Sequence, residues 1–210
     1  QHGLVQELFP ETEENRANAI LFDVQSDQVD GIQTILAEQD LPILSVSPIV
    51  SMRITSIKGR SITELRKDRS EPIPGWALRR EYRSTFRDTL TDSEKLVAGE
   101  WVSEASFEDP IVPISLDSGL AEDLKVALGD QIEFDVQGIP VTTEIASLRE
   151  VDWRRIQANF FVVFPKGVID DAPGFQVMTT YVPNTEASAR MQRRVTESFP
   201  NVSTVDLMLV

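Results

Sequence analysis

The chain reads AILFDVQSDQ at residues 19–28 and FQVMTTYVPNT at residues 175–185, and these two stretches near its opposite ends decide the predicted fold. Each is a β-rich run that ends in a polar turn. Ser26 in the first stretch and Asn184 in the second offer a side-chain oxygen suited to capping a helix. A proline stands sixteen positions after each of these two residues. The shared spacing predicts that both stretches begin the same strand–helix–strand unit.

A helix is predicted between each cap and its proline. Apolar residues recur at helical spacing, as Val29, Ile32, Ile35 and Leu36 in the first segment and as Ala187, Met191, Val195 and Phe199 in the second. Pro42 and Pro200 are expected to end these helices, because proline has no amide donor and restricts the residue before it. Strands are predicted to follow at residues 43–57 and 202–209. The chain therefore carries two β-α-β units, either as a true repeat or as two unrelated segments.

The residues between the two units predict an inserted, β-rich subdomain over residues 75–168. Pro72, Pro74 and Gly75 mark its start, since proline and glycine interrupt regular structure. The expected elements are strands at residues 78–86, 96–102 and 159–164, a hairpin at 132–136 and 141–148, and a helix at 115–128 capped by Asp117. The predicted fold class is α+β. Residues 16–62 and 173–210 form one discontinuous subdomain, and the insertion lies between its halves.

The composition excludes several classes of protein. The chain has 210 residues, no cysteine and a single histidine, His2. Disulfide frameworks, Cys-based zinc sites and thiol nucleophiles are therefore excluded. Only His2 is available for a histidine-based catalytic triad. The net charge of -14 argues against general binding of nucleic acids, which requires a cationic surface. The longest clearly apolar run, residues 160–164, is far shorter than the roughly 20 residues of a membrane-spanning helix.

No motif in the sequence predicts a reaction. Glycine-rich phosphate loops and the G-x-S-x-G nucleophile motif do not occur. The acid pairs Glu13-Glu14, Glu122-Asp123 and Asp170-Asp171 could bind a cation or transfer protons. The alternative is that they are solvated surface acids. We therefore expect a protein that is not an enzyme, without catalytic, cofactor-binding or metal-binding residues.

Basic residues gather between two acidic stretches. Residues 41–90 hold ten bases and five acids, and the basic block runs from Arg53 to Arg87. Such a block is typical of a contact with phosphate or anionic lipid. The alternative is a set of solvated strand faces and a loop whose bases pair with neighbouring acids. The candidate interaction surface within the block consists of Trp76, Arg79, Arg80 and Arg83. Whether the block contacts lipid is left open.

Several short segments, taken together and in order, resemble one family. They are LFDVQSDQ at 21–28, REY at 80–82, RDTL at 87–90, LVAGEW at 96–101, LAEDL at 120–124, LGD at 128–130, IEFDVQG at 132–138, VDW at 151–153, NFFVVFP at 159–165 and FPNVS at 199–203. The chain resembles an extracytoplasmic (periplasmic) domain of an ABC transporter permease of the FtsX/MacB/LolC type. Within that family it is most similar to the long YbbP-like permeases. The resemblance covers most of residues 16–210.

The resemblance implies a structure and a location. In this family the two β-α-β units form a subdomain often called Porter, and the inserted β-rich subdomain is called Sabre. Residues 1–15 are then a linker from a preceding membrane segment. The domain is expected on the periplasmic side of the inner (cell) membrane. No catalytic or ligand-binding residue is carried over, because the matching motifs are structural.

The resemblance also implies a function and partners. A separate cytoplasmic ABC ATPase subunit uses ATP, so this domain itself needs no cofactor. The domain is expected to relay ATP-driven motion to the export or extraction of a hydrophobic cargo. The alternative is a docking module that recruits a periplasmic partner, such as an esterase, without binding cargo. An unfamiliar hydrolase is a third possibility, and the cargo, the partner and the oligomeric state are not predicted.

Overall fold

The computed structural model describes residues 16–152 and 158–209. They divide into two compact units, each with its own hydrophobic core. The terminal subdomain contains residues 16–48, 158 and 175–209, and the inserted subdomain contains residues 49–152 and 159–174. The predicted linker at residues 1–15 lies outside the described residues.

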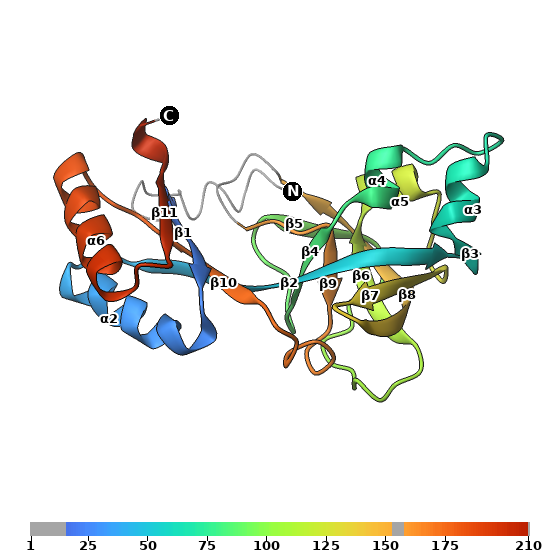
Figure 1. Ribbon diagram of the computed structural model, residues 1–210, viewed down its shortest axis with the longest axis horizontal. Coiled ribbons are helices and arrows are strands. Elements are labelled where there is room, and N and C mark those ends of the chain that lie inside the picture. Colours follow the sequence, from blue (N-terminus) through green and yellow to red (C-terminus); the bar gives the residue numbers. More distant parts are fainter. Residues whose placement is uncertain (1–15, 153–157, 210) are drawn as a thin grey trace. The chain divides into compact units, whose positions relative to one another are not determined.

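The terminal subdomain contains both β-α-β units (Figure 1). The first consists of β1 (Ala19–Val24), the 3₁₀ helix η2 (Ser26–Gln28), α2 (Val29–Glu38) and the start of β2 (Ile43–Ile57). The second consists of β10 (Phe175–Thr180), α6 (Thr185–Ser198), β11 (Ser203–Asp206) and the 3₁₀ helix η3 (Leu207–Leu209).

The strands of the two units interleave in one sheet. Their order is β11-β1-β10-β2, and β1 pairs antiparallel with both β10 and β11. Consequently β10 lies between the two strands of the first unit, and β1 lies between the two strands of the second. This is the split β-α-β arrangement. Neither unit completes its part of the sheet without the other.

Helices α2 and α6 cover the same face of this sheet, and Figure 1 shows them side by side. Ile32 and Leu36 of α2 and Met191 of α6 are fully buried against Leu21 and Met178 of the strands. Burial of this apolar surface is the main stabilising contribution. The helical spacing in the sequence correctly predicted which helix faces are buried.

The two helices begin differently. Asn184 caps α6 as predicted, since its Oδ1 accepts a hydrogen bond from the Ala187 amide at 2.8 Å. The prediction that Ser26 caps the first helix is wrong, because Ser26 lies inside the 3₁₀ turn η2. There the Gln28 side chain accepts a hydrogen bond from the Gln25 amide at 3.1 Å. Helix α2, which follows directly, has no side-chain cap at its N-cap residue Gln28.

The ends of the two units also differ in part from the prediction. Helix α2 ends at Glu38 and not at the proline, because Asp40 adopts a left-handed conformation with φ of 55° that turns the chain before Pro42. Helix α6 ends at Ser198, next to Pro200, as predicted. The final strand stops at Asp206, because the chain then turns into η3.

The inserted subdomain is mostly β. It consists of residues 49–57 of β2 followed by β3 (Arg60–Ser61), α3 (Ile62–Lys67), α4 (Gly75–Arg79), β4 (Tyr82–Phe86), β5 (Glu94–Gly99), β6 (Val112–Asp117), α5 (Ser118–Leu124), β7 (Gln131–Val136), β8 (Ile139–Val151) and β9 (Val162–Phe164).

Within the described residues, the strand pairings of this subdomain close a ring. β2 pairs with β4 and β7, β9 joins β4 to β6, and β8 joins β6 to β7. β5 extends the free part of β8 beyond β7. Apolar side chains from α3, α4 and α5 add to the core of this small barrel. The predicted α+β class is confirmed, because helices are combined with strands that pair mostly antiparallel, and parallel pairing of the described strands is confined to β4 with β9 and β6 with β8.

A helix and a strand of the insertion begin later than predicted. The helix expected at 115–128 begins only at Ser118, because Ser115–Asp117 continues β6; Asp117 still caps it, accepting the Leu120 amide at 2.9 Å. The strand expected at 78–86 begins at Tyr82, because residues 75–79 are the helix α4. The hairpin turn at Gln137-Gly138 is confirmed, and both residues have positive φ as a two-residue turn requires.

The boundaries of the two compact units in the sequence differ from the predicted ones. The first segment of the terminal subdomain ends at Pro48 and not at residue 62. The reason is that residues 50–57 of β2 pair with β4 and β7 of the barrel. A single long strand therefore supplies residues to both subdomains, which a hydrophobic pattern does not reveal.

Candidate interaction surface

The predicted surface residues lie on α4 and on the strand that follows it. Helix α4 begins after Pro74, whose carbonyl accepts a hydrogen bond from the Ala77 amide at 3.0 Å. Ala77 and Leu78 are buried in the core of the inserted subdomain. This leaves Trp76 and Arg79 exposed on the outer side of the helix.

Trp76 and Arg80 meet around the ring of Phe161. The Trp76 and Phe161 ring centroids are 6.3 Å apart, and the Arg80 guanidinium carbon lies 4.8 Å from the Phe161 centroid. The same carbon lies 6.0 Å from the ring of Tyr82. A guanidinium over an aromatic ring is held by the ring quadrupole. We call these four residues, with Trp76 44% exposed, the Trp76 cluster.

Tyr82 is the buried member of the Trp76 cluster. Its hydroxyl donates a hydrogen bond to the Ala77 carbonyl at 2.6 Å. Burial raises the pKa of the Tyr82 hydroxyl well above its usual value. Tyr82 therefore stays neutral and has a structural role. Only the exposed residues of the cluster, Trp76 and Arg80, can contact a partner.

Arg79 and Arg83 point elsewhere. Arg79 lines a depression that Trp76 does not line. Arg83 is exposed on β4, directly opposite Ser51 of β2. The structure thus brings two of the four predicted residues together and separates the other two. Their role as one interaction surface stays a prediction.

The depression has a volume of about 440 Å³ and is open to solvent. β2 contributes Arg53, Ile54 and Thr55, the β3–α3 junction contributes Ser61, Ile62 and Thr63, and α4 contributes Leu78 and Arg79. The sequence placed Arg53 and Arg79 in one basic block but gave no sign that the hydroxyl residues of α3 would lie beside them.

The basic block separates into two groups. One group pairs with acids, as its solvated alternative predicts: Lys58 lies 3.5 Å from Asp130, Arg60 lies 3.0 Å from Asp68, and Arg87 pairs with Glu94. The other group consists of the seven remaining bases, none of which forms an ion pair with an acid in residues 16–152 or 158–209: Arg53, Arg66, Lys67, Arg69, Arg79, Arg80 and Arg83. The unpaired bases therefore lie on or beside α4 and also on α3 and just after it.

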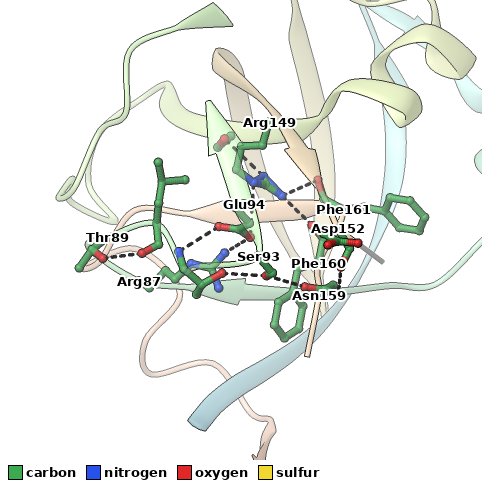
Figure 2. A network of polar contacts seen from close by, with 12 residues as sticks. Arg87, Thr89, Ser93, Glu94, Arg149, Asp152, Asn159, Phe160 and Phe161 are labelled. Carbon is green, nitrogen blue, oxygen red and sulfur yellow. Dashed lines mark hydrogen bonds and ion pairs between the residues drawn. The ribbon is translucent and has the colours of Figure 1, made fainter. Parts of the chain in front are cut away.

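A buried polar network lies next to Phe161 of the Trp76 cluster, whose carbonyl accepts a hydrogen bond from Arg149 at 3.4 Å (Figure 2). Arg149 of β8 is completely buried, donates to the Phe160 carbonyl at 2.6 Å and to Ser115 Oγ at 3.3 Å, and lies 3.6 Å from Glu94. Glu94 also pairs with Arg87. A buried charge requires such partners. The network therefore fixes β5 and β8 against the segment that leads into β9.

The network has the features of a structural element rather than a catalytic one. Burial lowers the pKa of Arg149 to about 10, while the Glu94 carboxylate opposes this shift, so Arg149 remains a cation at neutral pH. The Ser93 hydroxyl donates a hydrogen bond to Asn159 Oδ1 at 2.9 Å. An amide oxygen is not a general base, so this contact does not activate Ser93 as a nucleophile. The single histidine, His2, lies outside the described residues.

In the part of the chain that the structure describes, no group of three acidic or histidine side chains is arranged to hold a metal ion. No helix of residues 16–152 or 158–209 has the length and apolar character of a membrane-spanning segment.

Comparison with known proteins gives one sequence match. Over 202 residues and 96% of its length, the chain is 31% identical to the uncharacterized ABC transporter permease YbbP of Escherichia coli strain K12. The chain spans about a fifth of that relative, 22% of its length. No family model matches the chain. The sequence match confirms the predicted resemblance to ABC transporter permeases.

A solved structure is similar over most of the chain. It is the periplasmic region of MacB from Actinobacillus actinomycetemcomitans, at 12% identity and a TM-score of 0.49. The alignment covers 95% of this chain and 94% of that one.

Proposed function

We propose that this chain is a periplasmic domain of an ABC transporter permease of the inner membrane, which relays ATP-driven motion to the export or extraction of a hydrophobic cargo. The observation that carries this proposal is the 31% identity to the YbbP permease along 96% of the chain. A match that runs through both subdomains supports a shared architecture and not merely a shared motif.

The topology of the terminal subdomain suits a relay. β1, near the beginning of the chain, pairs with β11, near its end, from Ala19 opposite Asp206 to Phe22 opposite Ser203. A force applied to the chain before β1 or after β11 therefore acts on adjacent strands of one sheet. Because packed cores resist continuous deformation, the subdomain would move as a body.

The proposal assigns the chemistry to other parts of the transporter. A cytoplasmic ABC ATPase would bind and hydrolyse ATP, and this domain would work without a cofactor and without catalysis of its own. A direct check is ester hydrolysis by the 210-residue chain. We expect no turnover of short and long acyl p-nitrophenyl esters above buffer; turnover that disappears on replacing one serine would overturn the non-enzymatic assignment.

Reconstitution tests the relay. The permease that contains this chain is placed in liposomes with its ATPase. The liposomes contain a fluorescent acyl lipid, and a lipid-binding acceptor is present in the surrounding solution. We expect ATP-dependent release of the lipid, and none with an ATPase that binds ATP but does not hydrolyse it. If the ATPase hydrolyses ATP but the lipid is not released, the result would contradict cargo handling.

The Trp76 cluster favours a second candidate function, the recruitment of a periplasmic partner protein such as an esterase. Tryptophan and arginine are the residues most enriched among those that dominate protein interfaces. Trp76 is 44% exposed and is held in place by Phe161 at 6.3 Å. An exposed but immobilised tryptophan is suited to docking because little entropy is lost on binding.

Photo-cross-linking in the full permease separates the two functions. A benzoylphenylalanine at position 76 is expected to capture one periplasmic protein if the cluster is a docking surface, and the same probe at exposed Glu122 of α5 serves as the control. Equal capture at both positions would contradict docking at Trp76.

A further inference from the structure

Two arginines without acidic partners share the depression beside α4. Arg53 and Arg79 both line it, and Arg53 Nη1 donates a hydrogen bond to the Arg79 carbonyl at 3.1 Å. Neither forms an ion pair with an acid in the described ranges. Two positive charges that line one depression favour a bound anion there.

The neighbouring acids do not neutralise this pair. Asp135 of β7 is opposite Arg53 in the strand register but forms no ion pair with it. Glu64, in the first turn of α3, lies 4.0 Å from Arg60 instead. Both arginines are therefore available to form an ion pair with a bound anion.

The rest of the lining suits a small amphiphile. Ile54 and Leu78 are buried beneath the depression, and Ile62 is half-buried at its side. Thr63, an exposed residue of α3, also lines the depression. A volume of about 440 Å³ lies within the range of known small-molecule sites. Charge at the rim and apolar surface beneath it fit a charged group attached to a short acyl chain.

We infer that this depression is a binding site for a phosphate monoester group, held between Arg53 and Arg79, with an attached alkyl chain on the apolar floor. The planar guanidinium donates two parallel hydrogen bonds to phosphate oxygens, which makes arginine the residue suited to this recognition. A lipid headgroup can supply such a phosphate, whereas free phosphate shares only the anionic group and lacks the alkyl chain. The site lies wholly within the inserted subdomain, so it depends on neither the membrane nor the relay proposed above.

Binding is tested on the 210-residue chain with three probes. They are octyl phosphate below its critical micelle concentration, octyl glucoside and inorganic phosphate, followed by calorimetry and by amide chemical shifts of α3 and β2. We expect octyl phosphate to bind and to shift the amides of Ile62, Thr63 and Ile54. Arg79→Gln is expected to weaken this binding roughly tenfold or more, because one charge-assisted interaction is lost.

Matched variants separate a site from general charge. Arg66→Gln removes one charge from an exposed residue of the same basic block, on α3 but outside the depression, and is expected to leave the affinity within about twofold. Arg53→Gln serves as a second variant on another element. Circular dichroism and urea unfolding check that each variant is folded before binding is measured.

Each outcome decides the inference. Octyl phosphate binding tighter than inorganic phosphate supports the site and identifies the lipid headgroup as the source. Equal affinity of the two phosphates supports phosphate binding between the arginines but overturns the contact of an alkyl chain with the apolar floor. Equal binding of octyl glucoside, equal losses for Arg66→Gln and Arg79→Gln, or no binding of either phosphate would overturn it. Lipid release by the reconstituted permease would be unaffected by that failure, so the two proposals fail separately.

Discussion

Arg149 is the residue on which the buried network of the barrel depends. It is fully buried and holds Glu94 at 3.6 Å and the Phe160 carbonyl at 2.6 Å. Removing one partner of a buried ionic group is costly, because the remaining groups lose their compensation in a medium of low dielectric constant.

Replacing Arg149 with glutamine is therefore expected to lower the free energy of unfolding by about 3–5 kcal/mol. Urea unfolding measures this change. The control is Arg66→Gln, an exposed position where a change within about 0.5 kcal/mol is expected. A loss below about 1 kcal/mol for Arg149→Gln would show that the network does not stabilise the barrel.

Asp117 gives a dependence of stability on pH. Burial raises the pKa of its carboxyl above 3.8, although the Leu120 amide and Arg149 oppose this shift. In the native state the proton is therefore held more tightly than in the unfolded state. Between pH 3.8 and the raised native pKa, this group makes the protein less stable as the pH increases.

Asp117→Asn keeps an oxygen that can cap α5 but removes the titration. Its stability relative to the natural chain is expected to be greater at pH 7 than at pH 4, as measured by urea unfolding at a series of pH values. A relative stability that is constant, or that decreases over this range, would contradict the raised pKa.

Among the elements, α6 depends on a single side chain at its beginning. Asn184 Oδ1 accepts the Ala187 amide at 2.8 Å, and loss of such a cap costs about 1 kcal/mol. Asn184→Ala is expected to lower the free energy of unfolding by this amount, whereas Asn184→Asp, which retains the acceptor, is expected to be nearly neutral. Equal losses in urea unfolding for both variants would contradict the capping role.

The sequence predicted best those elements that bury a single apolar face. Helices α2 and α6 follow their apolar spacing, and the turn at Gln137-Gly138 follows its composition. The pattern failed where a segment is buried on more than one side. Ser115 and Leu116 are buried between β8 and β9, so residues that were predicted to be helical continue a strand.

The candidate surface shows the same limit. The sequence identified Trp76 and Arg80, but their shared contact is Phe161, which the barrel brings to α4 from a distant part of the chain. The hydroxyls of α3 likewise reach the depression only through the path of β2 and β3. Contacts made by distant pairing depend on the register of strands, which a local pattern does not determine.

At the scale of the whole molecule, the two ends of the chain fold as one subdomain. Asn18 donates to the Val182 carbonyl at 2.8 Å and accepts the Val182 amide at 2.7 Å, which joins residues 164 positions apart. The separate cores predict that each subdomain opens as its own unit.

Met191→Ala removes buried volume from the core of the terminal subdomain alone and is expected to cost about 2–5 kcal/mol. Native-state hydrogen exchange should then accelerate in β1, α2 and α6 but not in β6 and β8. Ile114→Ala, in the core of the barrel, is the matched control and should give the reverse pattern. Equal acceleration in both subdomains would mean that they open together.

The relay of ATP-driven motion is the central claim, and the cysteine-free chain allows a direct measurement. Thr34→Cys, on the exposed side of α2, carries a fluorescent donor in a permease otherwise free of cysteine, reconstituted with its ATPase among acceptor-labelled lipids. Energy transfer to the lipids is compared without nucleotide and with ATP trapped. The account predicts a change in transfer efficiency that is absent with an ATPase unable to bind ATP. The same efficiency in both states, while the ATPase remains active, would contradict it.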